Sequence, residues 1–192
     1  MLKLSLPFLP YLRRLQNEND DPSGIQPLNL PAEAAEICQN YVIETENYFL
    51  EGYIFNFDLL VVTFESAGGS DPRPDKFRAG WASIPLRKRK ISSLCIKPKR
   101  VDWYTRPDLA SIFKEIRSHF RKFRRVVTYG YSMGGFGALT FADLIGADEV
   151  HAIAPQSTLR RDIIPEDDRF PRSRNWSFDG LFGDAVGNYR NA

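Results

Sequence analysis

The sequence is poor in histidine and cysteine, and this scarcity restricts the chemistry that it can carry. Only two residues of each type occur among its 192 residues. Cys38 and Cys95 lie far apart and match neither a metal-binding spacing nor a redox motif. We therefore predict two buried, reduced thiols, and we expect neither a bound metal ion nor a cofactor.

Charge of one sign and long hydrophobic runs are also missing. The 26 Lys and Arg residues nearly balance the 24 Asp and Glu residues, so the chain has no large net positive charge that would attract nucleic acid. No apolar run approaches the roughly 20 residues that cross a bilayer. Pro7 and Pro10 interrupt the apolar N-terminal stretch, whereas a secretory signal has a longer unbroken core. We expect a cytoplasmic protein without a signal peptide and without a membrane or nucleic-acid partner.

The first half of the chain predicts three strands within one domain. Residues 41–45 and 48–57 are rich in aromatic and β-branched side chains, which predict an antiparallel pair. Residues 59–64 form a continuous apolar run, which is typical of a strand covered on both faces. A loop rich in glycine and proline follows over residues 65–76.

The second half alternates strands with helices. Further strands are predicted at 91–96, 125–130 and 149–154. Apolar residues recur at spacings of three and four between the first two of these strands, which predicts an amphipathic helix. These residues are Leu109, Ile112, Phe113, Ile116, Phe120 and Phe123. A second helix is predicted over 133–144. The alternation indicates an α/β fold with a mainly parallel sheet and flanking helices, and catalytic groups are expected at the carboxyl ends of the strands.

The most specific pattern is Gly130-Tyr-Ser-Met-Gly134, which lies between a predicted strand and a predicted helix. A serine at this sharp turn is typical of the G-x-S-x-G nucleophile elbow, which exposes the hydroxyl above the sheet. Ser132 would be the nucleophile, and the amide of Met133 at the helix N-terminus would bind an oxyanion. The alternative is a tight glycine turn in which Ser132 serves only as a helix N-cap.

A second oxyanion donor is expected from the loop that follows the strand at 59–64. Ser66 or Ala67 would supply this amide. Gly68 and Gly69 come directly after them and let the backbone approach closely.

The segment Gly130–Leu139 resembles the elbow of the α/β-hydrolase superfamily, and an architectural similarity extends over about residues 41–159. The resemblance implies a hydrolase-like core at 32–159, after an N-terminal extension and connector at 1–31 and before an irregular segment at 160–192. It also implies a Ser–His–Asp/Glu triad and a serine hydrolase that acts on a small-molecule ester or thioester through an acyl-enzyme. Acyl transfer would use the same residues.

The chain departs from this superfamily at the general base. A base must lie within hydrogen-bond reach of its nucleophile, yet His151 opens a predicted strand and His119 ends a predicted helix. Both are expected near the wrong edge of the sheet, in structural roles. Four acids follow the last strand, where one could serve the site, although a solvated acidic turn is favoured. They are Asp162, Glu166, Asp167 and Asp168.

No further sheet strand is predicted after Gln156, whereas a complete hydrolase would continue with more strands and a histidine. Two explanations stay open: a truncated version of a longer enzyme, which we favour, or a natural short relative that lost the triad. In the second case the chain would be a catalytically degenerate hydrolase-fold domain that binds a ligand or a protein.

Two smaller features concern exposure. The basic run Leu86–Lys90, together with Lys97, Lys99 and Arg100, predicts solvated charge beside a strand. Trp103 and Tyr104 follow that strand, and they either line a substrate pocket or cap the core.

Overall fold

A computed structural model describes residues 39–69, 78–171 and 176–188. The predicted N-terminal extension and Cys38 lie outside these residues. Cys95 is described, and it is a buried free thiol, as predicted. No helix within the described ranges is both long and apolar enough to cross a membrane.

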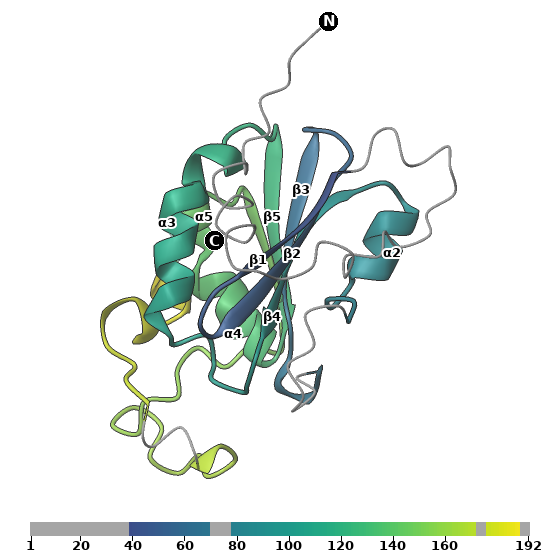
Figure 1. Ribbon diagram of the computed structural model, residues 1–192. Helices are drawn as coiled ribbons and strands as arrows, with labels where there is room; N and C mark the ends of the chain where they lie inside the picture. The colour runs from purple at the N-terminus through teal and green to yellow at the C-terminus, as the bar shows by residue number, and fades with distance from the viewer. Residues whose placement is uncertain (1–38, 70–77, 172–175, 189–192) are drawn as a thin grey trace, which may run out of the picture. The chain divides into compact units, whose positions relative to one another are not determined.

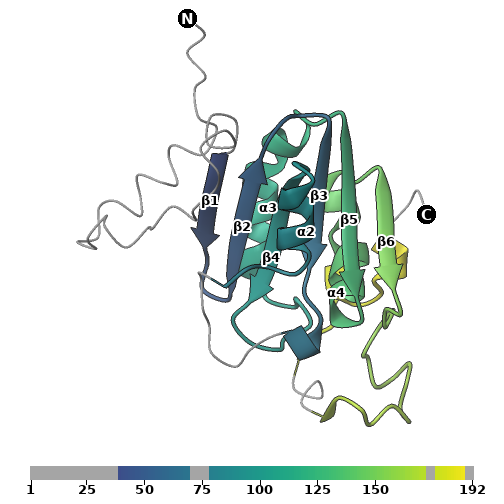
Figure 2. The ribbon, with the colours of Figure 1, turned by 90° about the vertical axis from the view of Figure 1, so that its right-hand side faces the viewer.

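A six-stranded sheet in the order β1-β2-β4-β3-β5-β6 forms the centre of the fold (Figure 1, Figure 2). The strands are β1 Gln39–Glu44, β2 Tyr48–Ile54, β3 Leu59–Phe64, β4 Ser92–Pro98, β5 Arg125–Tyr131 and β6 Glu149–Ile153. β1 and β2 pair antiparallel, and so do β2 and β4. β4, β3, β5 and β6 are all parallel. The predicted α/β class, with a mainly parallel sheet and an antiparallel N-terminal part, is confirmed.

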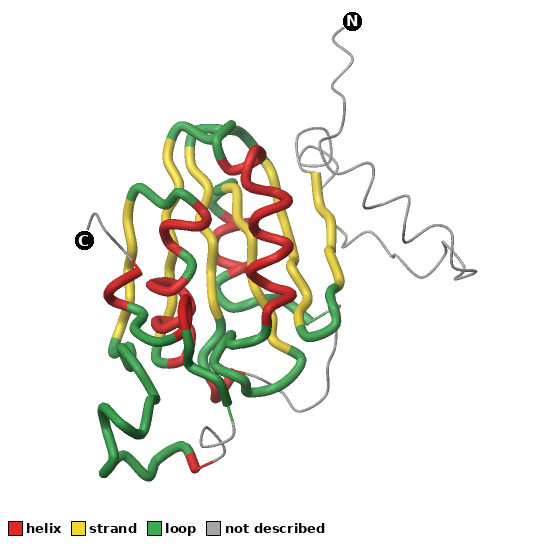
Figure 3. The backbone as a smooth tube through the Cα atoms, turned by 90° about the vertical axis from the view of Figure 1, so that its left-hand side faces the viewer, coloured by secondary structure: helices red, strands yellow, loops and turns green. Residues whose placement is uncertain are grey.

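Helices cover both faces of the sheet. α3 (Pro107–Phe120), α4 (Met133–Thr140) and α5 (Ala142–Ile145) lie on one face, and α2 (Ser83–Lys88) lies on the other (Figure 1, Figure 3). α3 buries the predicted apolar stripe from Leu109 to Phe120. The predicted helix at 133–144 is divided into α4 and α5 at Phe141, and α2 was not predicted at all. Short 3₁₀ turns occur at Ala67–Gly69, Gly180–Phe182 and Val186–Asn188.

Phe64, the last residue of β3, lies at the centre of the core beneath α3 and α4. Its ring centroid is 5.3 Å from that of Tyr104 and 6.0 Å from that of Phe141. A β-carbon on Gly137 would come within 2.7 Å of the Phe64 ring. This position in α4 is a glycine because the ring occupies the space that a side chain would need. The carboxyl end of β3 is therefore held firmly against the start of α4.

Trp103 and Tyr104 cap this core and do not line the cleft described below. Both are buried, at 1% and 0% exposure, and both adopt positive φ values of 53° and 56°. The Trp103 ring packs 4.4 Å from Phe170 and 5.9 Å from Trp176. This strained corner after β4 therefore joins the core to the C-terminal segment.

Asp102 stabilises the same corner and makes stability depend on pH. Its carboxylate accepts hydrogen bonds of 2.9 Å from the Tyr48 hydroxyl and from the Tyr104 amide. Burial raises the pKa of Asp102 from 3.8 to about 6, against the lowering effect of these donors. Because the pKa is higher in the folded state, the free energy of unfolding rises as pH falls from 7 through 6 toward 4. We expect a gain of about 2 kcal/mol by pH 4.5 from this group.

Asp102→Asn isolates that contribution, since other carboxylates also titrate in this range. Urea unfolding of both proteins at pH 7 and at pH 4.5 gives the difference between them. The wild-type protein should gain stability relative to the variant on acidification. If the two proteins respond equally to pH, Asp102 stays ionised in the folded protein at pH 4.5, and burial does not raise its pKa.

Candidate functional site

The chain turns sharply at Ser132, between the end of β5 and the start of α4. Ser132 has φ 53° and ψ −120°, a positive-φ conformation that residues other than glycine rarely adopt. Its amide donates a 2.9 Å hydrogen bond to the Ile153 carbonyl, and its carbonyl accepts one of 3.0 Å from the Phe136 amide. Ser132 occupies the N-cap position of α4, but its side chain makes no capping hydrogen bond to the helix.

Gly130 and Gly134 allow this turn because strand and helix backbones touch there. A β-carbon on Gly130 would lie 2.0 Å from the Gly134 carbonyl oxygen. A β-carbon on Gly134 would lie 2.1 Å from the Phe64 carbonyl oxygen and 3.0 Å from that of Glu65. Atoms this close cannot coexist, so each glycine lets one piece of main chain pass another.

Ser132 lines a cleft of about 600 Å³. Residues of the segment after β6 form most of the wall. The lining residues are Tyr131, Ser132, Ala154, Pro155, Gln156, Ser157, Thr158, Ile164, Asp167, Arg169 and Phe170. They combine hydroxyl, carboxamide and ionic groups with two aromatic rings. The Gln156 Oε1 atom is buried and has no hydrogen-bond partner among the described residues.

Asp167 lines the cleft, and the other three predicted acids do not. Its carboxylate binds Arg169 at two points, with Nε–Oδ1 of 2.8 Å and Nη2–Oδ2 of 2.6 Å. This pairing lowers the pKa of Asp167, so the group is ionised and its charge is balanced. Asp162, Glu166 and Asp168 are exposed, as expected for a solvated acidic turn.

Neither histidine lies near Ser132. His151 is paired in register with Tyr129, three residues before Ser132, which corresponds to roughly 10 Å along a strand. It is exposed, and its Nε2 lies 3.4 Å from Glu149. His119 is in the last turn of α3, which leads to the opposite end of β5. Within the described ranges, no side chain hydrogen-bonds the Ser132 hydroxyl.

The main chain after β3 passes directly beside the Ser132 turn. Phe64 pairs in register with Gly130. Ser66 lies two residues after Phe64, and Ser132 lies two residues after Gly130. The Glu65 carbonyl accepts a 2.8 Å hydrogen bond from the Tyr104 hydroxyl. Ser66 and Ala67 are partly exposed beyond this anchored point and are not among the residues that line the cleft.

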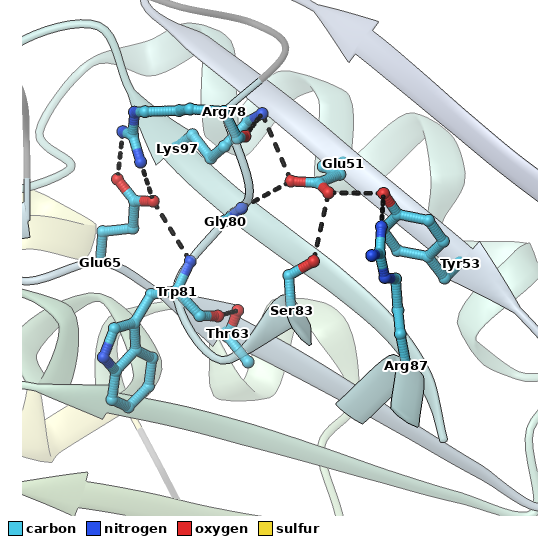
Figure 4. Close-up of polar contacts among 10 residues, drawn as sticks. All are labelled: Glu51, Tyr53, Thr63, Glu65, Arg78, Gly80, Trp81, Ser83, Arg87 and Lys97. Atoms are coloured by element: carbon cyan, nitrogen blue, oxygen red, sulfur yellow. Dashed lines mark hydrogen bonds and ion pairs between the residues drawn. The ribbon is translucent and has the colours of Figure 1, made fainter. Parts of the chain in front are cut away.

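A buried ionic network joins Glu65, which follows β3, to Arg78, which precedes α2 (Figure 4). This network was not predicted from the sequence. Arg78 binds the Glu65 carboxylate with two bonds of 2.6 Å and 2.5 Å. Lys97 lies 3.3 Å from Glu51, and its Nζ donates a 2.8 Å bond to the Arg78 carbonyl. Lys97 is fully buried, so the prediction of solvated charge was wrong for this residue. The available signals were an acid inside an apolar strand and another directly after one.

In the described part of the chain, no cluster of three or more His, Cys, Asp or Glu side chains is arranged to hold a metal ion.

No protein-family model matches the chain, and no curated protein matches it. Solved structures do. The capsule O-acetyltransferase of Neisseria meningitidis serogroup A is 14% identical, with a TM-score of 0.48 over 81% of this chain and 67% of that chain. A variant of that enzyme in complex with CoA is 16% identical, with a TM-score of 0.46 over 71% and 61%. The serine hydrolase FphF of Staphylococcus aureus is 13% identical, with a TM-score of 0.47 over 79% and 71%.

The chain thus spans 61% to 67% of the length of the acetyltransferase.

Proposed function

We propose that Ser132 is the nucleophile of a serine hydrolase that acts on a small-molecule ester or thioester. The observation that carries this proposal is the conformation of Ser132. A non-glycine residue is kept at φ 53° in a turn where its side chain makes no capping bond and where it lines a cleft. Backbone strain clusters at active sites, and at Ser132 it coincides with a position on the wall of the cleft, whereas the strained Trp103 and Tyr104 are buried in the core.

The chemistry follows from the groups around the turn. The Ser132 Oγ attacks the carbonyl carbon of the substrate and passes its proton to a base, while the carbonyl electrons move to the oxygen. The amides of Met133 and of Ser66 or Ala67 donate hydrogen bonds to this oxyanion. Collapse of the intermediate expels the alcohol or thiol with a proton and leaves an acyl-enzyme. Water then attacks the ester and releases the acid. An alcohol in place of water gives acyl transfer.

We propose that an imidazole-class base comes from outside these 192 residues, because His119 and His151 are the only histidines in the sequence and neither reaches the nucleophile. Without such a base, a serine hydroxyl is a weak nucleophile, and residual catalysis comes from the oxyanion amides and from binding. The cleft supports a small polar substrate, since its wall carries hydroxyl and carboxamide groups and the charges of Asp167 and Arg169 neutralise each other.

The test is covalent labelling of the full chain with a fluorophosphonate probe, with and without added imidazole. We expect slow labelling of Ser132 that imidazole accelerates, because free imidazole can substitute for a missing base. Ser132→Ala should abolish labelling, as read by intact mass and by mapping of the labelled peptide. A longer product of the same reading frame, where there is one, should be labelled faster.

Labelling that persists in Ser132→Ala would place the reactive group elsewhere. If no form of the protein is labelled at Ser132, the result supports the alternative function, in which a hydrolase-fold domain binds a ligand or a protein without catalysis.

A further inference from the structure

An ion pair joins the residue that leaves β3 to the segment that precedes α2. Glu65 follows β3 directly and is only 1% exposed. Its two carboxylate oxygens each accept one bond from the Arg78 guanidinium, at 2.6 Å and 2.5 Å, and the Trp81 amide lies 3.3 Å from Oε1. A two-point pair of this kind fixes the plane of the carboxylate as well as its distance.

Glu65 is held through its main chain as well. Its carbonyl accepts the 2.8 Å bond from the buried Tyr104 hydroxyl. Its backbone also packs against Gly134, in the first turn of α4. The peptide that leads from Glu65 to Ser66 is therefore restrained by its side chain, by its carbonyl and by the helix that begins after Ser132.

Arg78 is in turn fixed to the sheet (Figure 4). Its carbonyl accepts the bond from Lys97 in β4. The residues that follow it are held by two further strands. The Gly80 amide donates to Glu51 at 2.7 Å, and the Thr63 hydroxyl donates to the Trp81 carbonyl at 2.9 Å. The guanidinium thus presents a fixed surface to Glu65.

We infer that the Glu65–Arg78 ion pair is a positioning device that sets the oxyanion amide at Ser66 or Ala67 relative to Ser132. This inference rests on the proposed function, because it assigns the pair a role in that reaction. A buried ion pair is weak support for stability, since an apolar pair of equal volume can serve as well. What the pair adds is a fixed direction for the next peptide. A misplacement of about 1 Å at a reacting centre can lower the rate by roughly 100-fold.

Glu65→Gln tests this role on the full chain, and Asp108→Asn is its control. Asp108 accepts hydrogen bonds of 2.9 Å and 3.2 Å from Asn47, and among the described contacts it touches neither Glu65 nor Arg78. Each variant removes a carboxylate that joins distant parts of the chain, so both should lower the melting temperature. With a fluorophosphonate probe and imidazole, we expect Glu65→Gln to lower the maximal rate of Ser132 modification about 10-fold, with the probe's dissociation constant little changed. Asp108→Asn should change this rate less than about 2-fold.

Arg78→Gln and the double variant complete the test. If the pair acts as a unit, the double variant should be no slower than either single variant, because the second substitution has nothing left to disrupt. Equal rate losses in Glu65→Gln and Asp108→Asn, or additive losses in the double variant, would overturn the positioning role while Ser132 remains the nucleophile. An unmodified Ser132 in the wild-type protein, even with imidazole, would instead overturn both the proposed function and this role.

Discussion

Gly130→Ala should lower the free energy of unfolding by about 3 kcal/mol or more, because the new methyl group would clash with main-chain atoms on the neighbouring helix. Its β-carbon would lie 2.0 Å from the Gly134 carbonyl oxygen, 2.2 Å from the Gly134 carbonyl carbon and 2.7 Å from the Gly135 nitrogen. All three atoms are main chain in the first turn of α4, so no side-chain rotation relieves the contact. The helix must move away from β5, and the turn at Ser132 must open.

Urea unfolding of the variant measures the loss, and fluorophosphonate labelling of Ser132 should fall with it. Gly68→Ala is the matched control for stability, since nothing lies within 4 Å of its β-carbon position. We expect that substitution to change stability by less than about 0.5 kcal/mol. A Gly130→Ala protein as stable as Gly68→Ala would show that strand and helix are not in contact at this turn.

The fold was predictable where the pattern of side chains reports burial directly. The apolar run at Leu59–Phe64 is a central parallel strand, and the aromatic and β-branched segments before it are the antiparallel pair. The apolar stripe of α3 is buried as its spacing predicts. α2 was missed because Ser83–Lys88 has an isoleucine-proline pair after its first residue and ends in basic residues, so no apolar periodicity marks it. The break at Phe141 was also missed, because no local pattern marks it; the Phe141 ring packs against Phe64 and Phe113 in the core.

The turn at Ser132 was predictable because its glycines and serine have backbone requirements that are visible in the sequence. The wall of the cleft was not. Residues 154–170 contain few apolar residues, so nothing in their pattern indicates which face they cover or that Asp167, rather than its acidic neighbours, reaches the cleft. The distance of both histidines from Ser132 was predictable, because a residue that opens a strand or ends a helix here lies away from the carboxyl ends of the strands.

The ion pair between Lys97 and Glu51 is the clearest example of a contact that the sequence did not predict. Composition suggests that charged side chains are solvated, and Lys97 stands close to Lys99 and Arg100 in a basic stretch. The alternation of β4 nevertheless turns Lys97 inward, onto the face where Glu51 lies in the neighbouring strand. A charge in a strand has a partner that only the register can identify, and register is not legible in one sequence.

Lys97→Met should therefore cost about 3–5 kcal/mol of unfolding free energy, an effect typical of a buried pair that loses one member. Lys97 is 0% exposed, and methionine fills a similar volume, so the loss comes from charge and not from a cavity. Glu51 would keep its donors from Tyr53, Gly80 and Ser83 but lose its counter-ion, and the Arg78 carbonyl would lose its donor.

The control for this loss lies two residues along the chain. Lys99 pairs with Glu44 at 2.8 Å but on the surface, so Lys99→Met should cost less than about 1 kcal/mol. Lys97→Met combined with Glu51→Gln should cost at least about 1.5 kcal/mol less than the sum of the two single losses, since the lone buried charge is then gone. Urea unfolding of the four variants measures these differences. Equal costs at Lys97 and Lys99 would mean that water reaches Glu51, and that the segment carrying Arg78 is not anchored to the sheet as firmly as the positioning role of Glu65 requires.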